Sequence, residues 1–218
     1  MNKSEVIDFV NILKQTYPDA KCSLDFETPF QLAIAVMLSA QCTDERVNKT
    51  TPTLFERCKT IEDFENIDIN ELEDIIHPCG FYKNKAKNIK LCAKQVLENF
   101  NGVVPNNMDD LLTLAGVGRK SANVILLEVY GIANGIAVDT HAKRISNLMG
   151  LSNQKEPEKI EQDLLKVLPQ NLLPFVNHLF VWHGRNTCIA RNPKCNECTV
   201  KDFCQFYKKS CNLSKTQK

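Results

Sequence analysis

The chain has 218 residues, and its 27 basic and 26 acidic side chains leave a formal net charge of +1. This length allows one large or two small domains with a sizeable core. The longest near-apolar run, Leu32 to Ala40, is about half of the roughly 20 residues that a membrane-spanning helix needs, which excludes a membrane protein. The charge gives only weak support for nucleic-acid binding, because a basic domain usually has a pI above about 9.

Cysteine is frequent, at ten residues, but the N-terminus carries Lys3, Glu5 and Asp8 instead of the apolar run of an export signal. In a protein that is not exported, this many cysteines indicate reduced thiols and metal ligation rather than a disulfide framework. We therefore expect an intracellular, cytoplasmic protein.

Hydrophobic periodicity predicts helices along almost the whole chain, and no alternating strand pattern of useful length is present. Residues 4–17 have apolar side chains at helical spacing, and a helix that starts at Pro29 is apolar almost all round, which predicts a helix at the centre of a domain. The other predicted helices are, in chain order, residues 44–58, 69–76, 83–99, 108–114, 119–130, 139–149, 156–168 and 172–184. The predicted fold is all-α, with a polar tail over residues 210–218.

Charge is segregated between two neighbouring stretches. Residues 62–74 hold seven acidic side chains, and residues 83–94 hold five lysines, namely Lys83, Lys85, Lys87, Lys90 and Lys94. We interpret the acidic stretch as a face turned away from nucleic acid, although for either stretch taken alone an ordinary solvated helix surface is the favoured interpretation.

Residues 111–141 combine the features of a reactive site. Two predicted helices flank the turn Gly116-Val117-Gly118, and the second helix opens at Arg119 and Lys120. The glycines permit positive φ and close approach to another molecule, and the helix start leaves N–H groups unpaired. This combination is a natural seat for a phosphate.

Lys120 and Asp139 are candidate catalytic residues. A lysine amine forms Schiff bases when its surroundings disfavour the ammonium form, as the positive end of a helix dipole does. Asp139 then supplies the base, or stabilises positive charge that develops on a sugar. The alternative is that Lys120 is a surface phosphate contact and Asp139 the N-cap of a helix that Thr140 begins.

A second constellation has the spacing C-x6-C-x2-C-x5-C and consists of Cys188, Cys195, Cys198 and Cys204. Four thiolates this close together are enough for a tetrahedral metal site or an iron–sulfur cluster. Spacing alone leaves zinc and iron–sulfur both open. The remaining cysteines show no ligand spacing and are interpreted as small buried or incidental thiols.

These segments resemble the endonuclease III family of DNA glycosylases. The hairpin followed by AVDTHAKR (residues 137–144) resembles the family's helix-hairpin-helix and the loop after it, and residues 29–49, 80–89 and 183–195 extend the resemblance over nearly the whole chain. It implies a six-helix domain of residues 22–132, a second helical domain of residues 1–21 and 133–211, a cleft between them that holds Lys120 and Asp139, and a tail of residues 212–218. Ala115 stands where family members commonly carry proline.

The resemblance also implies roles for individual residues. Lys120 is the Schiff-base nucleophile, Asp139 its partner, and the four cysteines hold a 4Fe-4S cluster. Gln41 bonds the base left without a partner, and Phe81 wedges between base steps, unless Phe81 is an ordinary core aromatic. The other implied DNA contacts are Gly116, Val117, Gly118, Arg119, His141, Arg191 and Lys194.

The implied function is that of a bifunctional DNA glycosylase and AP lyase, which removes oxidised pyrimidines from damaged double-stranded DNA through a lysine Schiff base and β-elimination. A pyrimidine photodimer and a mismatched thymine are alternative substrates. The alternative functions are a monofunctional glycosylase, a non-catalytic helix-hairpin-helix DNA-binding protein, and a redox protein that uses the cluster. We expect a monomer that is located with the chromosomal DNA.

Overall fold

The computed structural model describes the backbone of residues 1–215 and the side chains of residues 1–210. The chain divides into two compact units, with Met1–Cys22 and Ile132–Lys218 in unit 1 and Ser23–Gly131 in unit 2. The domain limits expected from the sequence differ from these by one residue at each of the two crossings. Unit 2 is therefore a continuous segment inserted into unit 1, which is built from both ends of the chain.

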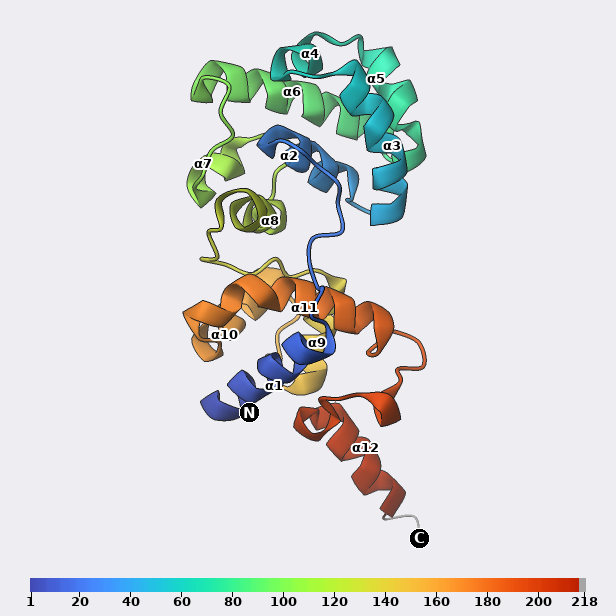
Figure 1. The fold of residues 1–218 in the computed structure, drawn as a ribbon, viewed down its shortest axis with the longest axis vertical. Helices are drawn as coiled ribbons and strands as arrows, with labels where there is room; N and C mark the ends of the chain where they lie inside the picture. Colours follow the sequence, from blue (N-terminus) through green and yellow to red (C-terminus); the bar gives the residue numbers. More distant parts are fainter. Residues whose placement is uncertain (216–218) are drawn as a thin grey trace. The chain divides into compact units, whose positions relative to one another are not determined.

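Unit 2 is organised around one apolar helix. Its helices are α2 (Pro29–Leu38), α3 (Asp44–Arg57), α4 (Ile61–Asn66), α5 (Ile69–Ile76), α6 (Tyr82–Phe100), α7 (Met108–Thr113) and α8 (Arg119–Tyr130), with a 3₁₀ turn η1 (His77–Cys79) before α6. Eight of the ten residues of α2 are buried, and α2 packs against α3, α6 and α8 (Figure 1). The predicted central helix is confirmed, since a helix that is apolar all round must be covered on every side.

Unit 2 has seven helices, one more than the six-helix domain that the resemblance implied. The additional helix is α4, whose start is a capping box in which Thr60 N donates to Asp63 Oδ2 at 2.9 Å and Asp63 N donates to Thr60 Oγ1 at 3.3 Å. Its one buried side chain, Phe64, packs edge-on against Phe30 with ring centroids 5.4 Å apart. Six residues with a single buried position are too few for helical periodicity to be visible among exposed acids.

Unit 1 has a core to which both ends of the chain contribute. Its helices are α1 (Lys3–Thr16), α9 (Thr140–Met149), α10 (Pro157–Val167), α11 (Leu173–Asn186) and α12 (Gln205–Lys215), with 3₁₀ turns η2 (Gln170–Leu172), η3 (Cys195–Glu197) and η4 (Lys201–Phe203). α11 packs against α1 and α9. The rings of Phe9 and Phe180 join α1 to α11 at a centroid distance of 5.9 Å.

The all-α prediction is confirmed, because the described part of the chain contains no strand. No helix within residues 1–215 combines the length and apolarity needed to cross a bilayer. α12 was not predicted, and it extends through Lys215 into the expected polar tail. Residues 216–218 of that tail, and the side chain of Cys211, lie outside the described residues.

The lysine stretch of α6 is not one solvated surface. Lys83, Lys87 and Lys94 are exposed, but Lys85 is buried. Lys90 is partly buried, and its Nζ donates to the backbone carbonyls of residues 65 and 67. The interpretation of the stretch as a single exposed face was wrong at these two positions, because a lysine on the inner side of a helix can find carbonyl acceptors there.

Candidate active site and metal centre

The hairpin between α7 and α8 depends on a glycine. The turn closes with a hydrogen bond from Val117 N to Leu114 O at 3.1 Å. Gly116 has a φ of +77°, and a Cβ atom there would lie 2.8 Å from the Met37 Sδ atom of α2. A side chain here would be strained by the positive φ and would press on Met37 and Asn88, which favours glycine.

A glutamine of α6 holds the hairpin in place. Gln95 Oε1 accepts a hydrogen bond from Ala115 N at 2.7 Å, and Gln95 Nε2 donates to Thr113 O at 3.1 Å. Proline has no N–H and could not make the first of these bonds. Ala115 therefore contributes an N–H donor to the turn that a proline at this position would lack.

Lys120 lies at the second position of α8, one residue after Arg119, and its side chain is exposed. The N-cap of α8 is Gly118, which offers no side chain to the first turn, so no side-chain cap satisfies the N–H groups there. The structure therefore brings the exposed amine to the same helix start as these donors. The predicted phosphate seat and the candidate nucleophile are neighbours.

Two predicted DNA contacts that are distant in sequence share a pocket within unit 2. Gln41 and Phe81 line it together with Gly116, and the other lining residues are Met37, Ala40, Asn84, Lys85 and Asn88. The Phe81 side chain is 64% exposed, so its interpretation as a core aromatic was wrong. Asn84 and Asn88 were not predicted, and the only signal for them in the sequence was their separation of four residues, which places both on one face of α6.

Asp139 is the N-cap of α9, as the alternative interpretation expected, and its Oδ1 accepts a hydrogen bond from Ala142 N at 2.7 Å. The connector before it is held by a buried contact, in which Ile136 N donates to Glu161 Oε1 at 3.0 Å. Gln170 Nε2 also donates to Ala133 O at 2.9 Å. The carboxylate is partly exposed at the end of a fixed connector, and the cap uses one of its two oxygens.

His141 is turned towards α11. A Cβ atom on Gly184 would lie 2.5 Å from His141 Nδ1, so the two helices approach closely here because residue 184 is glycine. Burial is the main effect on the His141 imidazole and lowers its pKa, and its Nδ1 lies 3.2 Å from Arg144 Nη2. These contacts give His141 a part in seating α9 against α11.

Arg144 makes structural contacts that the sequence alone does not reveal. Its Nε and Nη2 atoms donate to the Cys188 carbonyl at 3.0 and 2.7 Å, and Nη2 also donates to Gly184 O at 3.0 Å. The helix that Asp139 caps is thereby tied to the first residue of the cysteine segment. The sequence offered only the spacing of Arg144 three residues after His141, which puts both on one face of α9.

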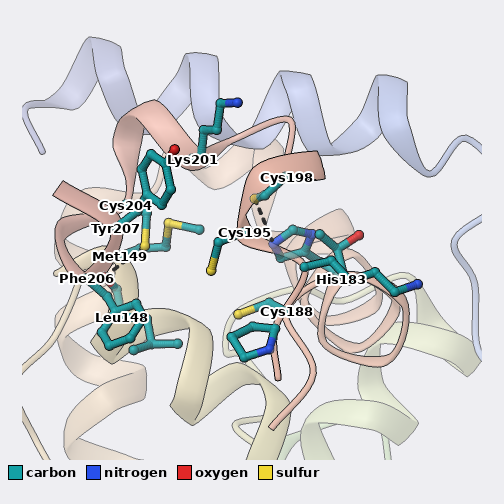
Figure 2. Close-up of a pocket in the computed structure, with 13 residues that line it drawn as sticks. Leu148, Met149, His183, Cys188, Cys195, Cys198, Lys201, Cys204, Phe206 and Tyr207 are labelled. Carbon is teal, nitrogen blue, oxygen red and sulfur yellow. Dashed lines mark hydrogen bonds between the residues drawn. The ribbon is translucent and has the colours of Figure 1, made fainter. Parts of the chain in front are cut away.

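The four spaced cysteines line one pocket of unit 1, in which Leu148, Met149, Phe206 and Tyr207 supply apolar surroundings. Figure 2 shows the sulfur atoms of Cys188, Cys195, Cys198 and Cys204 converging from the surrounding turns and helices. Within the residues that the structure describes, no three candidate ligands lie close enough together to share one metal ion. Four thiols distributed around a common pocket fit a cluster, which spreads its thiolates over several irons.

One of the residues that line this pocket is a buried histidine. His183 Nε2 lies 3.8 Å from Cys198 Sγ, and its Nδ1 lies 3.0 Å from the Tyr17 hydroxyl. Burial lowers the pKa of His183 to about 4, so the ring is neutral at physiological pH. Burial also raises the pKa of the Cys198 thiol to about 11. The pocket therefore favours the neutral forms of the histidine and the thiol. A bound metal centre supplies the positive charge that stabilises thiolates there.

The loop between the first two cysteines presents the two basic side chains that were predicted to meet phosphates. Arg191 and Lys194 are both exposed. Lys194 N donates to Thr187 O at 3.0 Å, and Asn192 adopts a positive φ of 57°, so the loop has a defined backbone. Both side chains belong to residues 188–195, a segment that begins and ends at cysteines of the pocket.

Comparison with known families agrees with this geometry. A family model described as "HhH-GPD superfamily base excision DNA repair protein" matches residues 34–170, which include the hairpin, Lys120 and Asp139. A second model, "Iron-sulfur binding domain of endonuclease III", matches residues 188–204, which begin and end at cysteines of the pocket. The fold and the site thus define a helix-hairpin-helix protein of base excision DNA repair with an iron–sulfur centre.

Individual relatives are similar over nearly their full length. Endonuclease III of Synechocystis sp. is 47% identical over 202 residues, which are 93% of this chain and 92% of that protein. Two solved structures, a non-covalent endonuclease III–DNA complex and a trapped endonuclease III–DNA covalent intermediate in an estranged-adenine complex, each match with a TM-score of 0.91 and 37% identity, covering 97% of this chain and 99% of theirs. The chain belongs to the endonuclease III family.

We expect the iron–sulfur centre to stabilise unit 1. Replacing Cys198 with serine removes one thiolate and leaves a hydroxyl in an apolar pocket. We expect the variant to lose its iron and to be less stable by roughly 3 kcal/mol or more, which lowers Tm by about 6–12 °C at this chain length. Iron content, the yellow-brown absorbance and thermal unfolding measure these effects.

The matched control is Cys22→Ser, which changes a partly buried cysteine outside the pocket. It should keep both its iron and its colour. A Cys198→Ser variant with full iron content, or a colourless native protein with stoichiometric zinc, would contradict the assignment.

Proposed function

We propose that the chain is a bifunctional DNA glycosylase and AP lyase of base excision repair, in which Lys120 is the nucleophile. The observation that carries the proposal is the exposed Lys120 amine beside an uncapped helix start and a glycine hairpin. A trapped covalent intermediate with DNA belongs to a relative that matches 97% of this chain. A lysine is the residue that forms such a bond with a carbonyl-like sugar carbon.

The reaction can be written with the chain's own groups. Lys120 Nζ attacks C1′ of the damaged nucleotide, and the base leaves with the electron pair of its bond to C1′ and takes up a proton from water. Asp139 stabilises positive charge on the sugar, accepts a proton from the attached amine and returns it to the ring oxygen as the ring opens to a protonated imine. A C2′ proton then passes to water, the electron pair of that C–H bond forms a C2′=C3′ double bond, and the 3′-phosphate leaves with the electron pair of the C3′–O bond, which nicks the strand. Water then hydrolyses the imine and releases the lysine.

The other proposed contacts hold the DNA open. A glycosylase has to turn its target nucleotide out of the duplex, which leaves a hole and a partner base without a pair. We assign Gln41 to that base and the exposed Phe81 ring to the gap, because both line the same pocket. The hairpin residues and Arg119 contact phosphate at the start of α8, His141 contacts DNA near Asp139, and Arg191 and Lys194 contact phosphate from the cysteine loop.

The cofactor is a 4Fe-4S cluster held by Cys188, Cys195, Cys198 and Cys204. When bound, the cluster supplies a cross-link between four thiolates, which fixes the backbone of the loop that carries Arg191 and Lys194. The substrate class that we propose is oxidised pyrimidine in double-stranded DNA, and the protein acts as a monomer. Because its substrate is chromosomal DNA, we place the protein inside the cell, in the cytoplasm.

The decisive experiment uses native protein and duplex DNA that contains a thymine glycol. We expect release of the base, nicking of the strand, and a covalent adduct when borohydride is present. Base release with neither an adduct nor a nick would replace the proposal with a monofunctional glycosylase. Tight binding without base release would replace it with a DNA-binding module.

A further inference from the structure

A buried lysine joins the two loops that carry Gln41 and Phe81. Lys85 is only 7% exposed, and its Nζ donates to Leu38 O at 2.8 Å, Ala40 O at 2.8 Å and Cys79 O at 2.9 Å. An ammonium group has three N–H donors, so each one meets a carbonyl. The acceptors lie at the end of α2 and in the turn before α6, about 40 residues apart along the chain.

Each acceptor is next to, or close to, a residue with unusual backbone geometry. Ala40 precedes Gln41, which has a φ of 54°, and Cys79 lies two residues before Phe81, which has a φ of 49°. Side chains other than glycine avoid this left-handed region, and where they occupy it the surrounding structure has to hold them there. The Lys85 backbone adds a further contact, because Lys85 N donates to Phe81 O at 3.1 Å.

We propose that Lys85 is a positioning residue, which clamps the loops of Gln41 and Phe81 at the spacing needed for both side chains to enter the opened duplex together. The proposal rests on the proposed function, because it assumes that a nucleotide is turned out of the helix. The ammonium does not reach the reacting sugar in this scheme. It acts through three backbone carbonyls that would lose their charged partner if residue 85 were apolar.

The same helix supplies a matched control. Lys90 also donates its Nζ to two backbone carbonyls, but these are those of Glu65, in the last turn of α4, and Ile67, the C-cap of α4. Replacing Lys90 with methionine removes a comparable clamp from a part of unit 2 that carries neither Gln41 nor Phe81. General loss of stability therefore affects both variants, whereas loss of loop spacing affects only Lys85→Met.

The first measurement needs no chemistry. A duplex with a tetrahydrofuran abasic analogue opposite 2-aminopurine is saturated with protein, and unstacking of the 2-aminopurine is followed by its fluorescence. We expect native protein and Lys90→Met to give the same fluorescence change, and Lys85→Met to give less than about half of it at full binding. Equal changes in all three proteins would overturn the proposal.

The second measurement separates positioning from stability. Single-turnover cleavage of a thymine glycol duplex should fall roughly 100-fold in Lys85→Met, the effect of misplacing groups by about 1 Å. Borohydride adducts on a single-stranded abasic oligonucleotide, which has no partner base and no hole to fill, should stay within about twofold of native protein. A parallel fall on both substrates would show that the lysine only supports the fold, and would overturn the proposal.

A second substitution tests the proposal if Lys85→Met does not fold. Lys85→Arg keeps a charged donor but replaces the compact ammonium with a planar fork, so it should shift the same two readouts in the same direction. If neither variant folds, Lys85 supports the core of unit 2 and the proposal is wrong. If native protein gives the fluorescence change but no adduct on any substrate, the proposed function fails while the fluorescence comparison still decides the role of Lys85.

Discussion

Lys120→Ala is expected to abolish the borohydride adduct on both thymine glycol and abasic duplexes. Removing a covalent nucleophile eliminates the intermediate itself, so strand nicking should fall by roughly 10³-fold or more. Unit 2 should fold normally, because the Lys120 side chain is exposed. Gel analysis of the trapped adduct, together with single-turnover nicking rates, measures the effect.

Lys120→Arg distinguishes the nucleophile from a phosphate contact. Arginine keeps the positive charge at the start of α8 but does not lose its proton in proteins, so it cannot form a Schiff base. We expect near-native DNA binding and no adduct. If the arginine variant kept its nicking activity while alanine lost it, Lys120 would be a phosphate contact and the nucleophile would have to be another residue.

Asp139→Asn is expected to lower the single-turnover rate by roughly 10²- to 10⁴-fold, the range for loss of a catalytic acid or base. Asparagine caps a helix about as well as aspartate, so the hydrogen bond to Ala142 N is retained and Tm should not change. The substitution therefore removes the carboxylate chemistry and keeps the N-cap. Rates with excess enzyme and thermal unfolding are measured on the same preparation.

The companion variant Asp139→Ala removes both roles. It should show the same loss of rate and, in addition, a loss of about 1 kcal/mol in stability from the missing cap, or roughly 2–4 °C in Tm. An asparagine variant with native rates would mean that the N-cap is the whole role of Asp139. The comparison separates two interpretations that the sequence left open.

The features that could be predicted from the sequence are those with a local physical cause. The apolar sequence of α2 and the spacing of Val6, Phe9, Val10 and Leu13 in α1 predicted helices with buried faces, and all four of these side chains are buried. The turn at Gly116 was predictable because few residues tolerate positive φ. The cysteine spacing indicated a metal centre because its four candidate ligands lie close together along the chain, so that this signal is local as well.

The features that could not be predicted depend on contacts between distant segments. Lys85 looked like its exposed neighbours, because nothing near it in sequence reveals the carbonyls of Leu38 and Ala40. The bond from Gln95 to Ala115 and the bonds from Arg144 to Cys188 join elements that are 20 and 44 residues apart. The structural role of such a side chain can be recognised only once the fold shows which distant backbone groups lie within hydrogen-bonding distance of it.

The insertion of unit 2 within unit 1 also sets the order in which a newly made chain can fold. Unit 2 is one continuous segment, so it is complete once Gly131 has left the ribosome. α1 is made first, yet Phe9 finds its partner Phe180 only after about 170 further residues, or roughly 10–30 s at ordinary rates of synthesis. During that interval its apolar face is a ready target for chaperones, and the amine of Lys120 is in place before the helix that Asp139 caps has a core to pack against.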